Sequence, residues 1–376
     1  YYFFALLFGL FFAGKIKDSN TISLPDHFYN HYGKNAGILS AIYIFILSSP
    51  APYILSLGFL IQHFSGLPYE FSLLTVSIIS ICYLWKGGLS AVIRTDYMQF
   101  ILMFAGFVLL LFFSHLHSNQ TESTILPLPD NFLHPTGGAT FQYILTWFFI
   151  ALWTFVDPGF YQRCTAATSK KTAQKGIFIS ILFWVLFDGL TFLTGMYAKL
   201  LIADAQPVLA YIQLAELVLP SVVLGIFIAA LLSVIMSTID SYTFISATTF
   251  GRDILWRVQM NPLKKSIDED QAIPLVKKGL IVTGLISLML ALSMPSVVRI
   301  WYTLGSVLVP GLIVPFVFSF LNKKLNVITM MVSPIIVSIL WILIKNIFGN
   351  YPLNIEPFYP GIATSIIFGI FVWLKK

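Results

Sequence analysis

The chain has 376 residues, of which 57% are hydrophobic and only 10% are charged. Soluble domains are about 45–50% apolar and about 25% charged, so this composition excludes an ordinary soluble protein and indicates an integral membrane protein. The two cysteines, Cys82 and Cys164, have no spacing that is typical of a metal site or a disulfide framework.

Apolar stretches divide the chain into segments that can cross a bilayer as helices. Eleven such segments follow one another, at 1–13, 36–63, 68–84, 91–113, 139–157, 176–200, 221–250, 276–294, 298–321, 326–346 and 359–374. The alternating pattern of a membrane barrel is absent, so we expect an all-α fold. The first segment is too short to span about 30 Å of hydrocarbon, and the chain lacks an initiator Met. We therefore expect an N-terminally incomplete piece of a longer protein.

The basic residues predict the orientation, because Lys and Arg accumulate in cytoplasmic loops. Every second loop is rich in them, and 19 of the 22 fall on one side; the exceptions are Lys199, Arg299 and Lys345. This asymmetry predicts a multi-pass protein with a cytoplasmic C-terminus, an external loop at 114–138 and a cytoplasmic loop at 251–278. The net charge of +6 is then a topology signal, and we expect the lipid bilayer, not nucleic acid, as its partner.

Segment 221–250 carries a polar stripe on one helix face. Its members are Ser233, Ser237, Asp240 and Ser241. Hydroxyls and a carboxylate in an otherwise apolar helix usually face a polar pathway or a bound ion. For Ser237 and Thr238 the simpler alternative is a hydrogen bond back to a carbonyl of the preceding turn.

Four acids lie within or beside apolar segments, and no Lys or Arg lies in the middle of a segment to pair with them. They are Asp96, Asp157, Asp188 and Asp240. A buried carboxylate without a partner either takes up a proton or binds a cation, so the predicted ligand is Na⁺ or H⁺. For Asp188 we favour a structural role, with Thr191 or a neighbouring helix as its hydrogen-bond donor.

The segment 139–157 ends in Asp157-Pro158-Gly159. Pro and Gly beside a carboxylate are typical of a discontinuous transporter helix, whose unwound backbone can contact a ligand. An ordinary helix end with a Pro stop explains the same pattern equally well.

Four stretches resemble the sodium/solute symporter family, which includes the sodium-coupled proline, pantothenate, sialic acid and glucose transporters. They are SLPDHFYNHYG at 23–33, WKGGLSAVIRTDYMQ at 85–99, DPGFYQRCTAAT at 157–168 and MSTIDSYTFISATTFGRDI at 236–254. The second and fourth are the most specific, and the resemblance runs through nearly the whole chain.

The resemblance implies one transporter domain over 1–376, with a core of ten helices in two inverted five-helix repeats. Core helices two to ten occupy 1–321, and two peripheral helices occupy 322–376. The first core helix is then missing, and this piece alone should not transport. The family's first and sixth core helices are broken near the membrane centre, and the sixth corresponds to the run that ends at Asp157.

The resemblance also implies the site residues. A sodium site is expected at Ser237 and Thr238, with the Val234 carbonyl as a third ligand. A second sodium site of some members is implied at Asp96, Ser237, Asp240 and Ser241. The solute is expected near Trp153 and Asp157, with Tyr302 as a weaker candidate, and its identity does not transfer between members.

We therefore expect a secondary transporter that imports a small organic solute with Na⁺ by alternating access. Two alternatives remain: a symporter-like sensor module of a histidine kinase, and a proton-coupled carrier in which Asp157 or Asp188 titrates. An enzyme is not expected, because the sequence has no HExxH, P-loop or GxSxG motif. The HFYNH stretch at 27–31 lacks an acidic partner suited to zinc.

Overall fold

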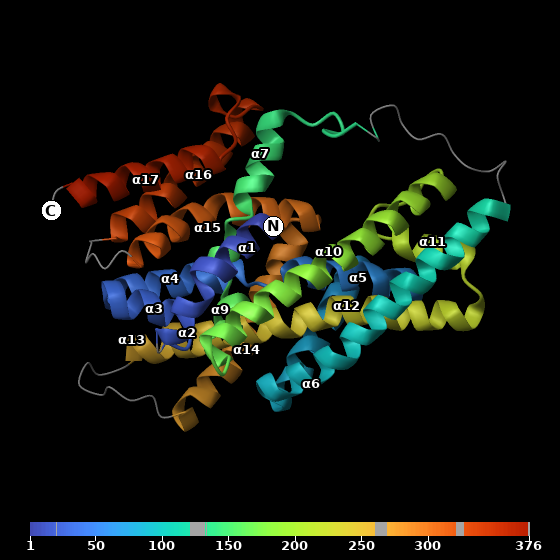
Figure 1. Cartoon of the computed structure of the whole chain (residues 1–376), viewed down its shortest axis with the longest axis horizontal. Helices are drawn as coiled ribbons and strands as arrows, with labels where there is room; N and C mark the ends of the chain where they lie inside the picture. The colour runs from blue at the N-terminus through green and yellow to red at the C-terminus, as the bar shows by residue number, and fades with distance from the viewer. Residues whose placement is uncertain (20, 121–131, 133, 260–268, 321–326, 375–376) are drawn as a thin grey trace.

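The computed structural model describes residues 1–19, 21–120, 132, 134–259, 269–320 and 327–374, without the side chains of 86–91, 259 and 269–271. The regular elements within these ranges are all helices (Figure 1). Eight are long and apolar enough to cross a membrane, and three shorter apolar helices cover Tyr2–Phe11, Tyr69–Trp85 and Phe358–Leu374. Together they match the eleven expected segments, so the all-α, multi-pass prediction is confirmed.

The N-terminal part contains an unexpected break. It forms α1 (Tyr2–Phe11), α2 (Ala13–Asp18), α3 (Leu24–Tyr32), α4 (Lys34–Leu47) and α5 (Ala51–Ser65). The segment 36–63 was expected as one helix, but α4 ends at Leu47 and α5 starts at Ala51. Pro50 explains the break, because proline lacks the backbone N–H and its ring clashes with the preceding turn. Gly33, with φ of +91°, allows the turn from α3 into α4.

The helix α6 (Tyr69–Gln120) joins two segments that the sequence separates, 68–84 and 91–113. In a straight helix, residues twelve apart are displaced by about 18 Å along the axis. The hydroxyl of Tyr83 nevertheless donates a hydrogen bond of 3.3 Å to Oγ1 of Thr95. The helix therefore bends sharply between these two residues, and its two arms still provide two apolar lengths.

The middle of the chain contains the second break. The helices are α7 (Phe141–Ile150), α8 (Trp153–Val156), α9 (Pro158–Ala166), α10 (Lys170–Leu201) and α11 (Ala210–Val218). Helix resumes at Pro158 directly after Asp157, which favours the discontinuous helix over an ordinary helix end. The long apolar helix α12 (Ser221–Thr248) continues as a π-helix, η2 (Thr249–Trp256), and as α13 (Arg257–Gln259).

The C-terminal part comprises α14 (Glu269–Ser293), α15 (Val297–Ser319), α16 (Ile328–Phe348), the short 3₁₀-helix η3 (Pro352–Asn354) and α17 (Phe358–Leu374). Both expected long loops are shorter than predicted. Helix α6 runs on to Gln120, and helix covers 249–259 and begins again at Glu269, so the loop expectation at 251–278 was wrong over these residues. The rest of these loops, 121–131 and 260–268, lies outside the described residues.

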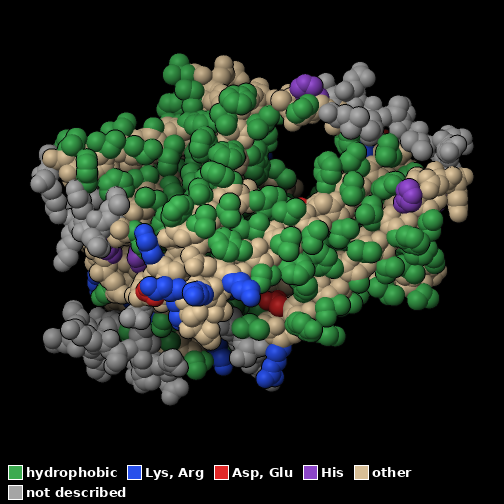
Figure 2. All heavy atoms as spheres, in the orientation of Figure 1, with side chains coloured by type: hydrophobic (Ala, Val, Ile, Leu, Met, Phe, Trp, Pro, Cys, Tyr) green, Lys and Arg blue, Asp and Glu red, His purple; other side chains and the backbone are tan. Residues whose placement is uncertain are grey.

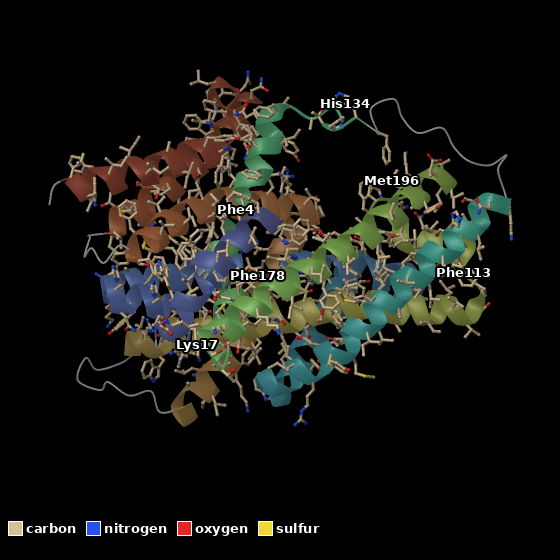
Figure 3. All side chains as sticks on the ribbon, in the orientation of Figure 1. Phe4, Lys17, Phe113, His134, Phe178 and Met196 are labelled. Carbon is tan, nitrogen blue, oxygen red and sulfur yellow. The ribbon has the colours of Figure 1, made fainter. Side chains whose placement is uncertain are left out.

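Close helix contacts hold α12 at the centre of the molecule. A methyl group at Gly106 of α6 would lie only 2.2 Å from the Cβ of Ala230 in α12, and one at Gly279 of α14 would lie 2.3 Å from the Ala247 carbonyl oxygen. Because glycine has no side chain, α6 and α14 can both pack closely against α12 at these positions. Hydrophobic side chains cover most of the visible face, and Lys and Arg gather toward one end (Figure 2). There Lys17, labelled in Figure 3, donates to the Thr165 carbonyl at 2.9 Å.

Candidate functional site

Two hydroxyls of α12 converge on one carbonyl oxygen. Ser237 Oγ donates to Val234 O at 3.2 Å, and Thr238 Oγ1 donates to the same oxygen at 3.1 Å. This is the back-bonding that the sequence left open. The hydroxyl oxygens keep lone pairs for a cation, but the Val234 carbonyl already accepts two hydrogen bonds. It can act as a third ligand only when one of the hydroxyls turns away.

A pair of unsatisfied carboxylates lies beside these hydroxyls. Asp240 is only 2% exposed, and the charges of Asp96 on α6 and Asp240 on α12 lie close enough to repel each other. Oδ2 of Asp240 and Oδ1 of Asp96 are buried and have no hydrogen-bond partner among the described residues. Buried carboxylate oxygens without donors favour a cation or a proton between them. The structure thus brings together Asp96 and Asp240, which are 144 positions apart in the sequence.

The other members of the stripe differ in their bonding. Ser233 Oγ donates to the Ala229 carbonyl at 2.8 Å and is buried, so its hydrogen-bonding need is met within α12. Ser241 directly follows Asp240 and is half-buried. Oxygen ligands of this kind, a hydroxyl beside a carboxylate, suit a hard cation.

Asp157 connects the helix break to α12. It is the residue between α8 and α9, with an extended backbone, and its Oδ1 accepts a hydrogen bond of 2.9 Å from Phe160 N as the cap of α9. Its Oδ2 accepts a hydrogen bond of 3.0 Å from the Tyr242 hydroxyl. Tyr242 lies two residues after Asp240 and so on another face of α12 than the polar stripe; the hydrogen bond therefore ties the broken helix to α12, the helix that carries the stripe.

Aromatic rings extend from this contact to α15. The rings of Tyr242 and Tyr53 have centroids 5.6 Å apart, and those of Tyr53 and Trp301 are 5.8 Å apart. Trp153 is buried against α15, where a methyl group at Gly305 would lie 3.7 Å from its ring. Thr154 Oγ1, on the same turn, is buried without a hydrogen-bond partner among the described residues. Aromatic faces beside a few polar groups are typical of small-molecule sites.

Tyr302 makes a different set of contacts. Its hydroxyl donates to Glu356 at 2.5 Å, and its ring lies 5.5 Å from Trp147 and 6.0 Å from Tyr143 of α7. The neighbouring Trp301, not Tyr302, has a ring contact toward Tyr53 and thus toward Asp157.

One expectation about the acids needs correction. No Lys or Arg was expected to pair with these acids, but Arg163 of α9, three residues before the end of the apolar stretch Phe141–Ala166, lies near Asp157. A methyl group at Gly159 would lie 3.0 Å from both Arg163 Nη1 and Asp157 Oδ1, so these charges are near neighbours. The reason is that helix continues for nine residues after the break. Asp188 accepts a hydrogen bond from Tyr2 of α1, so the expected donor on a neighbouring helix is confirmed.

The histidines of the HFYNH stretch do not form a metal site. No group of three or more His, Cys, Asp or Glu residues in the described part of the chain could hold a metal ion. His27 Nε2 instead lies 2.7 Å from Ser319 Oγ, which itself donates to the Phe316 carbonyl, so the histidine donates. Burial lowers the pKa of His27 to about 4, with His31 adding a smaller effect, and the ring is therefore neutral.

Four further residues of this region were not predicted from the sequence: Tyr53, Thr154, Tyr242 and Trp301. Tyr242 had a usable signal, because it follows the polar stripe within the most specific motif. The other three are ordinary apolar-helix residues in sequence, and only the packing of three separate helices brings them near Asp157.

Comparisons with known proteins agree with this geometry. The family model described as "Sodium:solute symporter family" matches residues 2–337. The chain is 25% identical over 289 residues to the high-affinity proline transporter PutP of Bacillus subtilis, covering 73% of this chain and 60% of that protein. It is 23% identical over 377 residues to the sodium/proline symporter of Staphylococcus aureus, covering 93% of this chain and 71% of that protein.

A solved structure shares the fold. It is titled "Substrate-bound outward-open state of a Na+-coupled sialic acid symporter reveals a novel Na+-site", and it superposes with a TM-score of 0.73 over 99% of this chain and 82% of that chain. The two sequences are 19% identical, so this similarity establishes the architecture alone.

Proposed function

Because the chain belongs to the sodium:solute symporter family, we propose that it takes part in importing a small organic solute together with Na⁺, by alternating access. The observation that carries this proposal is the contact between the broken helix and α12, the helix that bears the polar stripe, through the Asp157–Tyr242 hydrogen bond of 3.0 Å. One element offers a solute-facing carboxylate and the other offers cation-binding oxygens. A movement that changes one site is therefore transmitted to the other.

The first sodium site in this proposal uses Ser237 and Thr238, with Val234 O as a conditional ligand. Both hydroxyls already lie within 3.2 Å of that carbonyl, so three oxygens are gathered on one turn. Neutral oxygens hold a monovalent ion weakly, which suits an ion that is released in every cycle. Further ligands come from outside α12, as they do in the family's first sodium site.

A second sodium site at Asp96, Ser237, Asp240 and Ser241 is supported by the two unsatisfied carboxylates. A cation between Asp96 and Asp240 removes their mutual repulsion and satisfies the oxygens that lack donors. A proton shared by the pair has the same effect, which is the basis of the proton-coupled alternative.

The solute site in this proposal is the break at Asp157, with Trp153, Thr154 and the aromatic rings as its walls. Tyr302 lies one layer of side chains further from Asp157, and its hydroxyl donates a hydrogen bond to Glu356. The relatives' solutes, proline and sialic acid, differ in chemistry, so neither is transferred to this chain.

We extend the same proposal to the architecture and the energetics. Helices up to α15 form core helices two to ten of two inverted repeats, α16 and α17 are peripheral, and the C-terminus faces the cytoplasm. Each Na⁺ that moves inward contributes about 2.3 kcal/mol per 100 mV and about 1.4 kcal/mol per tenfold concentration ratio. Ions that bind one state more tightly than the other couple this free energy to the solute.

The test is sodium-dependent uptake by the full-length protein, screened with amino acids, sugars, vitamins and organic acids. With a transported solute in hand, Thr238→Ala should raise the Na⁺ concentration for half-maximal uptake by about tenfold, since one ligand is lost. Thr194→Ala is the matched control, because Thr194 makes the same back-bond, 2.9 Å to the Leu190 carbonyl, in α10. Uptake driven by a proton gradient without Na⁺ would reject the proposal, and unchanged sodium dependence in Thr238→Ala would reject this site.

A further inference from the structure

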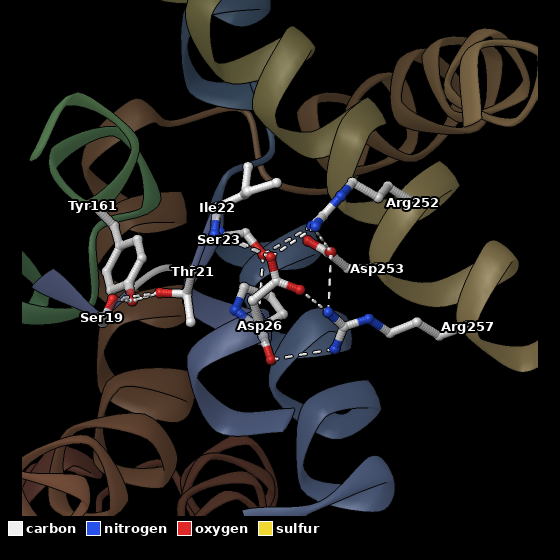
Figure 4. A network of polar contacts seen from close by, with 10 residues as sticks. Ser19, Thr21, Ile22, Ser23, Asp26, Tyr161, Arg252, Asp253 and Arg257 are labelled. Carbon is white, nitrogen blue, oxygen red and sulfur yellow. Dashed lines mark hydrogen bonds and ion pairs between the residues drawn. The ribbon is translucent and has the colours of Figure 1, made fainter. Parts of the chain in front are cut away.

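Four buried charged residues join the end of the α12 helix to α3 (Figure 4). Arg252 donates to Asp26 Oδ2 at 2.7 Å and to Asp253 Oδ1 at 2.6 Å. Arg257 donates to the other oxygen of Asp26, and its guanidinium lies 4.5 Å from the ring centre of Tyr29. Two acids and two arginines thus form one neutral network between elements more than 220 residues apart.

The network lies in the interior, where charges are costly. All four residues are at most 8% exposed, and Asp253 Oδ2 has no hydrogen-bond partner in the described part of the chain. Burial lowers the pKa of Arg257 to about 10, so the guanidinium remains charged at neutral pH. Apolar side chains of similar size often stabilise a fold as well as such a buried network does. The presence of the network therefore points to a role in selecting one particular arrangement of α3 relative to the helix that continues α12.

The location of the network explains what it can control. Arg252 and Asp253 lie in the π-helix η2, which continues the helix that bears Ser237 and Asp240. A π-helical stretch is rare and often marks a functional site, because its extra residue per turn is strained. On the other side, Ser23 and Asp26 cap α3 reciprocally, so Asp26 is firmly placed. The network thus fixes the end of the proposed sodium-binding helix against α3.

The same short segment also holds the broken helix. We call Ser19 and residues 21–26 the connector; residue 20 lies outside the described residues and is not part of this definition. Thr21 Oγ1 lies 2.5 Å and Ser19 Oγ 3.3 Å from the hydroxyl of Tyr161 in α9 (Figure 4). One end of the connector therefore binds the helix with the solute-facing carboxylate. The other end binds the helix with the cation-binding oxygens.

We propose that the connector and the network of Asp26, Arg252, Asp253 and Arg257 form a clamp that positions the ends of α9 and α12 and opens when ion and solute are released to the cytoplasm. This inference rests on the proposed function. While both contacts hold, α9 and α12 stay tied to the same segment and the path between their ends is closed. Release requires the ends to separate, so at least one of the two contacts must break.

The chain contains its own reporter for this opening. Cys164 follows Tyr161 by one helical turn and is only 1% exposed, whereas Cys82, the other cysteine, is exposed. In a full-length protein in which Cys82 is replaced by Ser and every cysteine outside residues 1–376 is also replaced, a membrane-impermeant maleimide added from the cytoplasmic side reports exposure of Cys164 alone. We expect slow labelling in Na⁺, which favours the clamped state.

The decisive variant is Asp26→Asn, which keeps the size of the side chain and removes its charge. We expect it to raise the rate of Cys164 labelling in Na⁺ by about tenfold. Asp18→Asn is the matched control, because Asp18 forms an ion pair with Lys170 that is exposed to solvent, and its labelling rate should not change. If Asp26 has a purely structural role, Asp26→Asn should lower the thermal midpoint, and Na⁺ should still slow Cys164 labelling as much as it does in the wild-type protein.

A second variant tests the clamp even if Asp26→Asn does not fold. Arg257→Lys keeps the positive charge but loses the fork geometry, and we expect a smaller rise, of about threefold. Wild-type labelling rates in both variants would overturn the clamp even if uptake remains sodium-dependent. Uptake and labelling that are both insensitive to Na⁺ in the wild-type protein would instead overturn the proposed function.

Discussion

At the scale of single residues, Asp240 determines how many ions the proposed mechanism can use. Its side chain is almost fully buried, one oxygen has no donor among the described residues, and Asp96 repels it. These conditions raise the free energy of the unpaired Asp240 carboxylate, and a bound cation or a proton lowers it again. The polar stripe identified this residue in the sequence, but its partner on α6 was placed beside it only by the family resemblance.

We predict that Asp240→Asn reduces the number of Na⁺ ions per solute from two to one, because the amide cannot neutralise a second cation. Reversal-potential measurements on the full-length transporter give this ratio. Asp204→Asn, at an exposed position between α10 and α11, should leave it unchanged. If Asp240→Asn keeps the wild-type ratio, Asp240 has a structural role.

His27 shows how burial turns a residue of an apparent metal motif into a packing residue. The folded protein holds it neutral, with a pKa of about 4, whereas the unfolded chain has a value near 6.5. The unfolded state therefore binds more protons between these values. Stability is complete above about pH 6.5 and is lost as pH falls toward 4.

We predict a loss of about 3 kcal/mol in the free energy of unfolding between pH 6.5 and 4 from His27. His27→Gln, which can still donate to Ser319, should flatten this part of the pH profile of the thermal midpoint. His134→Gln, at an exposed position, should retain the wild-type profile. A His27→Gln profile as steep as that of the wild type would show that other groups cause the acid sensitivity.

At the scale of elements, some causes of the helix breaks and close helix crossings can be recognised in the sequence, and others cannot. Asp157-Pro158-Gly159 was recognisable in the sequence, and the helix does restart at Pro158. Pro50 causes a similar break that was missed, because the long apolar runs on both sides of the SSPAP stretch at 48–52 resemble one continuous segment. The bend of α6 between Tyr83 and Thr95 falls where the sequence separates the segments 68–84 and 91–113, but the continuation of the helix through this bend was not expected.

We predict that Gly106→Ala destabilises the protein by about 1–3 kcal/mol, because the added methyl group would meet Ala230 at 2.2 Å and push α6 away from α12. Gly176→Ala is the control: its methyl group would meet nothing within 4 Å in α10, and it should stabilise by up to about 1 kcal/mol through helix propensity. Thermal unfolding of the two purified variants gives the comparison. Equal midpoints would show that α6 and α12 can separate at this crossing without cost.

At the scale of the whole molecule, charge and helix arrangement describe the same orientation. Lys and Arg gather toward one end of the molecule in Figure 2, and Figure 1 shows the end of α17 on the same side as α13. The opposite end carries the C-terminal end of α6. That the end rich in Lys and Arg faces the cytoplasm stays a prediction from the uneven distribution of basic residues over alternate loops.

We predict that a fluorescent protein fused after residue 376 of the full-length protein fluoresces, and that alkaline phosphatase at the same position is inactive, because both report a cytoplasmic location. Alkaline phosphatase inserted within 121–131 should be active. The reverse pattern would contradict the orientation assigned from Lys and Arg.

The sequence by itself determined the membrane class, the number of apolar segments and the polar stripe on one helix, because hydropathy and helical spacing are local properties of the chain. The resemblance of its motifs added the family. Only the tertiary structure decided which further side chains meet: Tyr242 with Asp157, Arg163 beside the break, and Asp26 with Arg252 and Arg257. These contacts join helices from distant parts of the chain, and their geometry depends on how closely the helices pack. The spacing of residues along the chain does not predict that packing.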